Sequence, residues 1–381
     1  MKKKKNEYKP QRHKHLIRNM VSVLGTLVLA YFFIVVGYSV AKPFGEIGEI
    51  KTSDLNLETD SIADQQLESV ESSETPESEE IVKAYWLRET DIESAETLEG
   101  LINIIGNKYN MVVVPLKIEG GKLNYATSYE EAILAEVGNE LELTTIYNTI
   151  KNKGYTPVAS INAMQDNLYP KTNKNSGFVL KSNKSLWLDT QNEKGKPWLN
   201  PASTETKQYL QSITGEIAKA GFRHIICTNM EYPSFSKEAL DDIGGIVTET
   251  DRYLDLVDNV NNMTHTAQDR GSTMWLEISA HDMLTGVCEV FFKPIMLDTE
   301  KYVVKIDLSK FSKKLKINGE TIDFSKMSTG EKIETICSEI EKTIYKSSYI
   351  PEITSSSLNM KQKQEIEDTF DKMGYDSYIL R

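Results

Sequence analysis

Short apolar runs alternate with helical patterns along the chain from residue 81 onward. Eight runs have the length of a buried strand, and several are rich in Val and Ile. They lie at 83–88, 111–117, 156–163, 224–231, 273–280, 301–308, 348–354 and 376–380. Between several of them apolar residues recur every three or four positions, as at Ile333, Ile336, Ile340 and Ile344, which is typical of a helix with one buried face. The pattern predicts eight strands with helices between them.

Eight strand–helix units over about 300 residues fit one architecture best. Strands that alternate with helices form parallel sheets, and this number of units favours a single (β/α)8 TIM barrel over an open, doubly wound sheet. No glycine-rich nucleotide-binding motif follows the first strands, which argues against the open sheet. Asn318-Gly319 within 315–324 predicts a hairpin inserted after the sixth strand.

One segment near the N-terminus is apolar enough to cross a bilayer. Residues 20–41 contain no charged side chain, and a helix of about 20 residues spans the hydrocarbon core. Eight Lys and Arg residues precede it, so the positive-inside rule predicts a basic cytoplasmic tail at 1–19 and an extracellular remainder. A cleaved signal peptide is the alternative, because residues 39–41 (Ser-Val-Ala) suit a signal peptidase. The apolar region of a signal peptide is ordinarily shorter than residues 20–41, so we expect a single-pass anchor in the cell membrane.

Residues 42–80 predict a disordered acidic linker. Positions 46–80 carry twelve acidic residues against one lysine and contain no aromatic residue. Such a composition buries too little apolar area to offset the entropy of ordering the chain. An acidic segment can also bind a partner, but a solvated spacer is far commoner. We therefore expect a flexible stalk that carries a globular domain at 81–381.

Charge and cysteine content exclude several classes of function. The net charge of residues 81–381 is −9, whereas nucleic-acid binding requires a basic face. The cysteines Cys227, Cys288 and Cys337 have no metal-ligand spacing, and no HExxH, CxxC or GxSxG motif is present. The sequence therefore predicts no nucleic-acid partner, no metal and no cofactor.

Four stretches resemble, in the same order, a family of extracytoplasmic TIM-barrel proteins that is classed among the glycoside hydrolases largely by inference. They are VVVPLKIEGGKLNY at 112–125, ASINAMQD at 159–166, AGFRHIICTNMEYP at 220–233 and EISAHDMLTG at 277–286. Each is similar to a strand and its exit in the family pattern. The resemblance spans the globular part and implies a TIM barrel that acts on carbohydrate.

The chain departs from the family pattern at charged positions. Pro115 and Ser160 stand where the family has an Asp and an Arg, and Thr228 and Glu231 stand where it has another Asp and Arg. The polar positions that match are Lys117, Asp166, Ser279 and, if His281 is an insertion, Asp282. The resemblance implies substrate contacts for these residues, but the lost charges leave catalytic activity open.

Carboxylates at the C-terminal ends of the strands are the candidate catalytic groups, because the reactive groups of a (β/α)8 barrel project from those ends. Four residues qualify: Glu231, Glu277, Asp307 and Glu352. Glycoside hydrolysis requires a proton donor and a second carboxylate, which is a nucleophile at about 5–5.5 Å or a base for water at about 6.5–9.5 Å.

We expect Glu231 to be the proton donor. It ends a strand that is otherwise apolar, and burial raises the pKa of a carboxyl group. Its surroundings, Asn229-x-Glu231-x-Pro233, loosely resemble the Asn-Glu-Pro of retaining glycosidases, whose nucleophile lies on the seventh strand. That layout selects Glu352 as the partner, while Glu277 on the adjacent strand is the competing candidate. Any of these acids could instead be an ion-paired structural group.

Other residues are candidates for contact with a substrate. A pyranose ring packs well on a flat aromatic side chain, and most tryptophans of a barrel belong to its core. We therefore expect one or two of Tyr85, Trp86, Trp187, Trp198 and Trp275 to face a groove. With the residues implied by the resemblance, the predicted contacts are Trp86, Lys117, Asp166, Asn229, Ser279, Asp282 and Asp307.

Two functions remain open. One is a membrane-anchored extracytoplasmic glycoside-hydrolase-like protein that acts on, or binds, polysaccharide of the cell envelope, peptidoglycan included. The other is a catalytically inactive barrel that serves as a glycan- or protein-binding scaffold. The sequence identifies neither the sugar and its linkage nor a protein partner.

Overall fold

The computed structural model describes residues 80–190, 195–243, 249–286, 301–355 and 358–381. All of them belong to one compact unit, Ser78–Arg381. The predicted cytoplasmic tail, membrane span and linker lie outside the described residues. Within the described residues, no helix combines the length and the apolar character needed to cross a bilayer.

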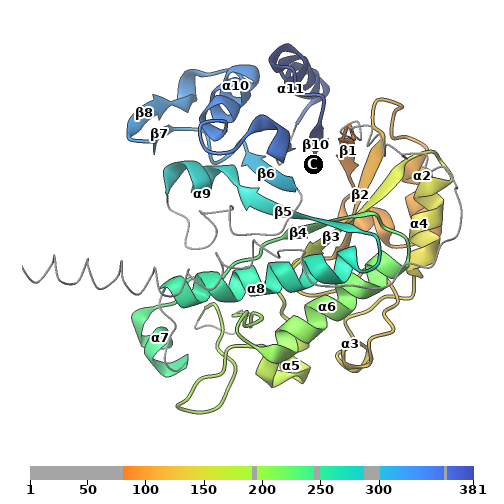
Figure 1. Cartoon of the computed structure of the whole chain (residues 1–381), viewed down its shortest axis with the longest axis vertical. Helices are drawn as coiled ribbons and strands as arrows, with labels where there is room; N and C mark the ends of the chain where they lie inside the picture. The colour runs from red at the N-terminus through yellow and green to blue at the C-terminus, as the bar shows by residue number, and fades with distance from the viewer. Residues whose placement is uncertain (1–79, 191–194, 244–248, 287–300, 356–357) are drawn as a thin grey trace, which may run out of the picture. The chain divides into compact units, whose positions relative to one another are not determined.

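Eight parallel strands close into a barrel (Figure 1). They are β1 (Lys83–Trp86), β2 (Met111–Lys117), β3 (Thr156–Asn162), β4 (His224–Thr228), β5 (Thr273–Ser279), β6 (Lys301–Asp307), β9 (Tyr349–Thr354) and β10 (Tyr378–Leu380). Each strand pairs with the next along this order, and β10 pairs with β1 to close the ring. The predicted TIM barrel is confirmed, with each strand close to its predicted position.

The predicted hairpin is also confirmed. Strands β7 (Lys314–Ile317) and β8 (Glu320–Asp323) pair antiparallel outside the barrel. Asn318 and Gly319 form the turn with φ of 49° and 88°, the positive values that a two-residue hairpin turn requires. The hairpin lies between β6 and α10, so it belongs to a loop at the C-terminal end of the barrel.

Helices cover the outside of the barrel (Figure 1). The longer ones are α2 (Ala95–Ile102), α4 (Leu143–Lys151), α6 (Thr204–Lys219), α8 (Glu249–Gln268), α10 (Thr329–Ile340) and α11 (Met360–Met373), and the shorter ones are α3 (Glu130–Leu134), α5 (Tyr169–Thr172), α7 (Lys237–Ile243) and α9 (Ala280–Thr285). Helices α6 and α8 lie side by side, and α10 packs with α11. Ile333, Ile336 and Ile340 of the predicted stripe form the buried face of α10, whereas Ile344 is buried beyond the C-terminal end of that helix.

The interior of the barrel changes from apolar to polar along the strands. Val158, Ile226, Trp275, Val303 and Ile350 belong to one buried cluster inside the ring. Side chains two positions apart on a strand point the same way, so the next inward residues form a second layer nearer the C-terminal ends. That layer contains Ser160, Thr228, Glu277, Lys305 and Glu352. The sequence therefore places two acids and a base inside the barrel mouth.

Candidate active site

Two glutamates of the polar layer are surrounded by cations. Glu277 and Glu352 are both buried, at 9% and 0% relative exposure. The Arg381 Nη1 atom lies 3.3 Å from Glu352 Oε1 and 3.6 Å from Glu277 Oε2. The Lys305 Nζ atom lies 3.4 Å from Glu277 Oε1. Two acidic and two basic side chains therefore form one compact cluster.

The two carboxyl groups influence each other strongly. Burial, and then the negative charge of Glu277, raise the pKa of Glu352 to about 8, while Arg381 and Lys305 act in the opposite direction. The Oε2 atoms of both glutamates are buried and have no hydrogen-bond partner among the described residues. A proton held by Glu352 and donated toward Glu277 accounts for this arrangement. Glu352 therefore keeps its proton to a higher pH than an isolated carboxyl group does.

Glu231 lies next to this cluster. Asn229 follows β4 with φ of 49°, a left-handed conformation that turns the chain at the strand end. Gln165 donates a hydrogen bond from Nε2 to Glu231 Oε1 at 3.1 Å. Burial raises the pKa of Glu231, and the charges of Asp282 and Glu277 raise it further. Glu231 and Glu277 therefore share one electrostatic environment at the mouth of the barrel.

A cleft of about 620 Å³ opens over this layer. Its volume is within the range of small-molecule sites, about 300–1,000 Å³. Its lining includes Trp86, Pro115, Asn162, Gln165, Asn229, Lys305 and Arg381. Lys305 and Arg381 line the cleft and also contact the buried glutamates, so they connect the cleft to the carboxyl cluster.

Comparison with known proteins identifies the domain. A family model described as "Putative glycosyl hydrolase domain" matches residues 84–290, more than half of the chain. The chain belongs to this family. A search of curated proteins finds no match.

Of the two solved structures reported next, the first agrees with this assignment at the level of the fold. The glycoside hydrolase domain of PgaB (BpsB) from Bordetella bronchiseptica superposes with a TM-score of 0.58 at 12% identity, over 79% of this chain and 94% of that one. Ega3 from Aspergillus fumigatus, in complex with galactosamine, gives a TM-score of 0.41 at 12% identity, over 79% and 91% of the two chains. At these identities the likeness is one of fold alone.

Within this glycosyl hydrolase domain, Lys117 and Asp166 form a buried ion pair, whereas their motifs imply contact with a substrate. Lys117 Nζ lies 3.1 Å from Asp166 Oδ2, and neither side chain has any exposed surface. Lys117 also donates to the carbonyl oxygens of Asn162 and Ala163, and Asp166 accepts from the backbone N–H groups of Leu168 and Tyr169. Lys117 is among the residues that line the cleft, yet its side chain has no exposed surface, and the ion pair holds together the loops that follow β2 and β3. Contact of Lys117 and Asp166 with a substrate stays a prediction.

The remaining predicted contacts are distributed around the mouth. Asn229 and Trp86 line the cleft, whereas Trp187 and Trp275 are buried elsewhere. Ser279 accepts a hydrogen bond from the Asp282 backbone and caps α9. Other polar groups have local partners: Asp282 Oδ1 lies 2.9 Å from His281 Nδ1, and Asp307 accepts hydrogen bonds from the backbone and hydroxyl of Ser309.

The cations of the site were missing from the sequence-based candidates. The criterion used for the candidates, a carboxylate at the end of a strand, excludes Lys305 and Arg381. Lys305 interrupts an apolar strand two residues before Asp307, and Arg381 follows the last strand. The same criterion applied to basic side chains selects Lys305 and Arg381. Among the described residues, no group of three or more His, Cys, Asp or Glu side chains is arranged to hold a metal ion.

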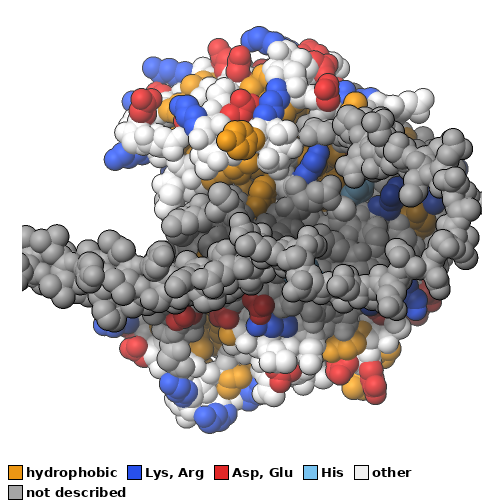
Figure 2. Space-filling model, in the orientation of Figure 1, with side chains coloured by type: hydrophobic (Ala, Val, Ile, Leu, Met, Phe, Trp, Pro, Cys, Tyr) orange, Lys and Arg blue, Asp and Glu red, His pale blue; other side chains and the backbone are white. Residues whose placement is uncertain are grey.

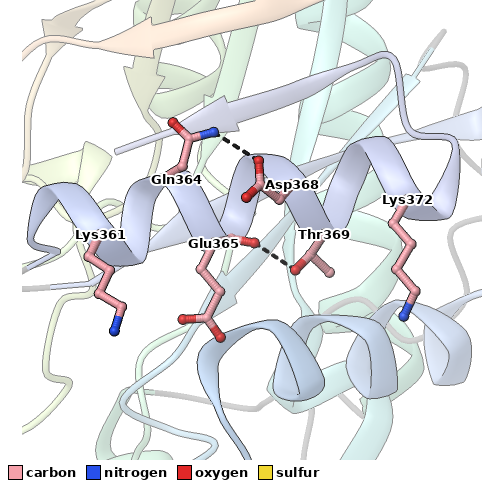
Figure 3. A pocket seen from close by; sticks show the side chains of 6 residues that line it. All are labelled: Lys361, Gln364, Glu365, Asp368, Thr369 and Lys372. Atoms are coloured by element: carbon pink, nitrogen blue, oxygen red, sulfur yellow. Dashed lines mark hydrogen bonds between the residues drawn. The ribbon is translucent and has the colours of Figure 1, made fainter.

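A second hollow, of about 370 Å³, lies along the outer face of α11 (Figure 3). It is lined by Lys361, Gln364, Glu365, Asp368, Thr369 and Lys372. Glu365 accepts a hydrogen bond from the Gly330 backbone, and Lys372 lies 3.3 Å from Glu334, both on α10. These contacts join two neighbouring helices, so we assign the hollow to helix packing.

Proposed function

We propose that this protein is a glycoside hydrolase anchored in the cell membrane, with its barrel outside the cell, and that it cleaves a polysaccharide of the envelope such as peptidoglycan. The observation that carries the proposal is the pairing of Glu231 with Glu277. They lie at the exits of neighbouring strands, and each contacts residues that line the cleft. Gln165 donates a hydrogen bond to Glu231, while Lys305 and Arg381 form ion pairs with Glu277.

Glu231 is the proton donor in this proposal. Its raised pKa keeps a larger fraction of the carboxyl protonated near neutral pH, which a general acid requires. The amide of Gln165 fixes the orientation of the carboxyl group. Glu231 would protonate the glycosidic oxygen as the bond to the sugar breaks.

Glu277 is the second carboxylate. Lys305 and Arg381, at 3.4 and 3.6 Å, stabilise negative charge on it, and that charge would stabilise the oxocarbenium-like transition state. Glu352 has no exposed surface, so we assign it the role of orienting Glu277 through a shared proton. Glu277 is therefore preferred over Glu352 as the partner of Glu231.

A scaffold without catalytic activity is the second candidate, and one observation favours it. The Arg381 guanidinium lies 4.3 Å above the Trp86 ring and also contacts both buried glutamates. A sugar that stacked on Trp86 would compete with this guanidinium. If Arg381 does not move, the cleft binds a glycan without access to Glu277.

The Glu231→Gln variant distinguishes the two candidates. General acid catalysis contributes about 10²–10⁴-fold, so turnover should fall by that order while the nearly isosteric amide preserves the fold. The full-length chain in non-ionic detergent would be assayed for reducing sugar released from peptidoglycan and from surface polysaccharide. Glu142→Gln is the matched control, because Glu142 is exposed and is not among the residues that line the cleft.

Three outcomes are informative. Loss of turnover with an unchanged melting temperature supports Glu231 as the proton donor. Unchanged turnover in the Glu231→Gln variant would show that the active site lies elsewhere. Binding without turnover in the unmutated protein supports the scaffold.

A further inference from the structure

Exposed lysines gather on the loop that carries the hairpin. The segment 308–328 contains five lysines against two acids, in a domain whose net charge is −9. All five side chains are exposed, and we call them the lysine rim: Lys310, Lys313, Lys314, Lys316 and Lys326. Figure 2 shows basic side chains with interspersed acidic ones on this part of the visible face, over β7 and β8.

The hairpin presents part of the lysine rim in a regular array. Lys314 and Lys316 are exposed on β7, while Leu315 and Ile317 between and after them turn toward the protein. Residues two apart on a strand are separated by about 7 Å, so Lys314 and Lys316 present their positive charges side by side along β7. Within the described residues, Lys314 is the one member of the rim that has a carboxylate within 4 Å, that of Asp323 at 3.8 Å. The other ammonium groups face solvent.

The lysine rim belongs to the catalytic face of the barrel. It lies in the connection from β6 to α10, and connections that leave strand ends lie at the C-terminal end of a TIM barrel. The positive charge of Lys310 lowers the pKa of Glu231 against the larger effect of burial, so the rim and the site are close enough to interact. Lys305 and Arg381 extend the positive charge into the cleft.

We propose that the lysine rim binds the chain of an anionic glycan, one that carries carboxylate or phosphate groups, and guides it into the cleft. This inference rests on the proposed function and names its substrate class. Ammonium groups on a solvated surface attract such groups at long range, and the attraction weakens as salt screens it. A glycan held along the rim would lie beside Glu231 without any change in the barrel.

The test uses the triple variant Lys313→Gln/Lys316→Gln/Lys326→Gln in the full-length chain in non-ionic detergent. The probes are polygalacturonate for carboxylate, long-chain polyphosphate for phosphate, and dextran as the neutral polymer. Three surface contacts together are worth roughly tenfold in affinity at low salt, and the triple variant should lose that factor for one or both anionic polymers. The loss should shrink at physiological salt, where the Debye length is about 8 Å.

The matched control removes three exposed lysines at the other end of the barrel, Lys151, Lys153 and Lys219, and should bind as the unmutated protein does. Equal affinity for dextran, or equal losses in both triple variants, would overturn the proposal. Binding to mixed micelles that contain phosphatidylglycerol, with neither anionic polymer bound, would also overturn it and assign the rim to a membrane surface.

The binding assay separates this inference from the proposed function. Glu231→Gln should bind polygalacturonate or polyphosphate as tightly as the unmutated protein, because binding requires no turnover. Binding of an anionic polymer by a protein that releases no reducing sugar from peptidoglycan or surface polysaccharide supports the rim and contradicts the hydrolase. Hydrolysis of neutral glycans without any preference for anionic ones contradicts the rim alone.

Discussion

At the scale of single residues, three glutamates near one cleft differ in what surrounds them. Glu352 is fully buried next to another acid, and its pKa rises to about 8. Glu231 is partly buried and hydrogen-bonded to Gln165, and its pKa is also raised. Glu277 faces two cations. The differences among them come from burial and neighbouring charge, because the side chain is the same.

Glu352→Gln should alter the pH dependence of stability. The pKa of Glu352 is about 8 in the folded protein and about 4.3 in an unfolded chain, so the folded state binds the extra proton between these values. The free energy of unfolding of the unmutated protein therefore falls as the pH rises from about 4.3 to about 8. The glutamine variant removes this decrease, because its amide stays neutral and can still donate to Glu277.

Urea unfolding of both proteins from pH 5 to pH 9 measures the difference. The variant should gain stability relative to the unmutated protein as the pH rises through this window. A difference that is constant across the window would show that Glu352 does not hold a proton in the folded state. Glu320→Gln serves as the control, since Glu320 is exposed on β8 outside the barrel.

At the scale of elements, two loops at the barrel mouth are held together by a buried ion pair. Lys117 ends β2 and Asp166 follows β3, so their 3.1 Å contact joins two strand exits. Gly121 lies against the carboxylate of Asp166 with φ of 96°. A side chain at this position would have its Cβ 2.0 Å from Asp166 Oδ1. The loop therefore depends on a glycine both for its backbone and for space.

Gly121→Ala should destabilise the protein more than Gly154→Ala. Both glycines have positive φ, which costs an alanine about 1–2 kcal/mol, but nothing lies within 4 Å of a Cβ at Gly154. The free energy of unfolding should therefore fall by at least ~1 kcal/mol more for Gly121→Ala, because the clash disturbs the buried ion pair. Urea unfolding measures both variants. Equal losses would mean that the loop shifts freely and that Lys117 and Asp166 do not fix it.

The elements were predictable from the sequence because the apolar pattern records burial. Eight apolar runs and the Asn318-Gly319 turn gave the strands and the hairpin. The apolar pattern predicts a fourth strand that extends to residue 231, whereas β4 ends at Thr228. The strand ends there because Asn229 adopts a left-handed conformation, which an apolar pattern does not reveal. The carboxylates at strand ends were found by the same reasoning.

The sequence could not predict which polar side chains contact one another in the folded protein. Lys117 and Asp166 match polar positions of the family, but a motif does not distinguish an exposed side chain from one that is fully buried. The two residues are about 50 positions apart in the chain, and their ion pair forms only when folding brings the loops after β2 and β3 together. Arg381 similarly meets Glu277 and Glu352 because β10 closes the ring beside β9.

At the scale of the whole molecule, the sequence divides into parts with different physical roles. Residues 20–41 are apolar and uncharged, residues 46–80 are acidic and lack aromatic residues, and the barrel follows. The expected order is an anchor, a stalk and a domain, with the domain on the outer side of the membrane.

A Glu-specific protease added to intact cells tests this order. The stalk predicted at 46–80 is rich in Glu and should be cut readily, because proteases cleave flexible, exposed segments. The expected product is a soluble fragment that retains residues 81–381, detected with an antibody against the barrel. Cells opened before treatment should give the same fragment. A fragment that appears only after the cells are opened would reverse the orientation, and a soluble barrel released without protease would indicate signal-peptide cleavage after Ala41 in place of an anchor.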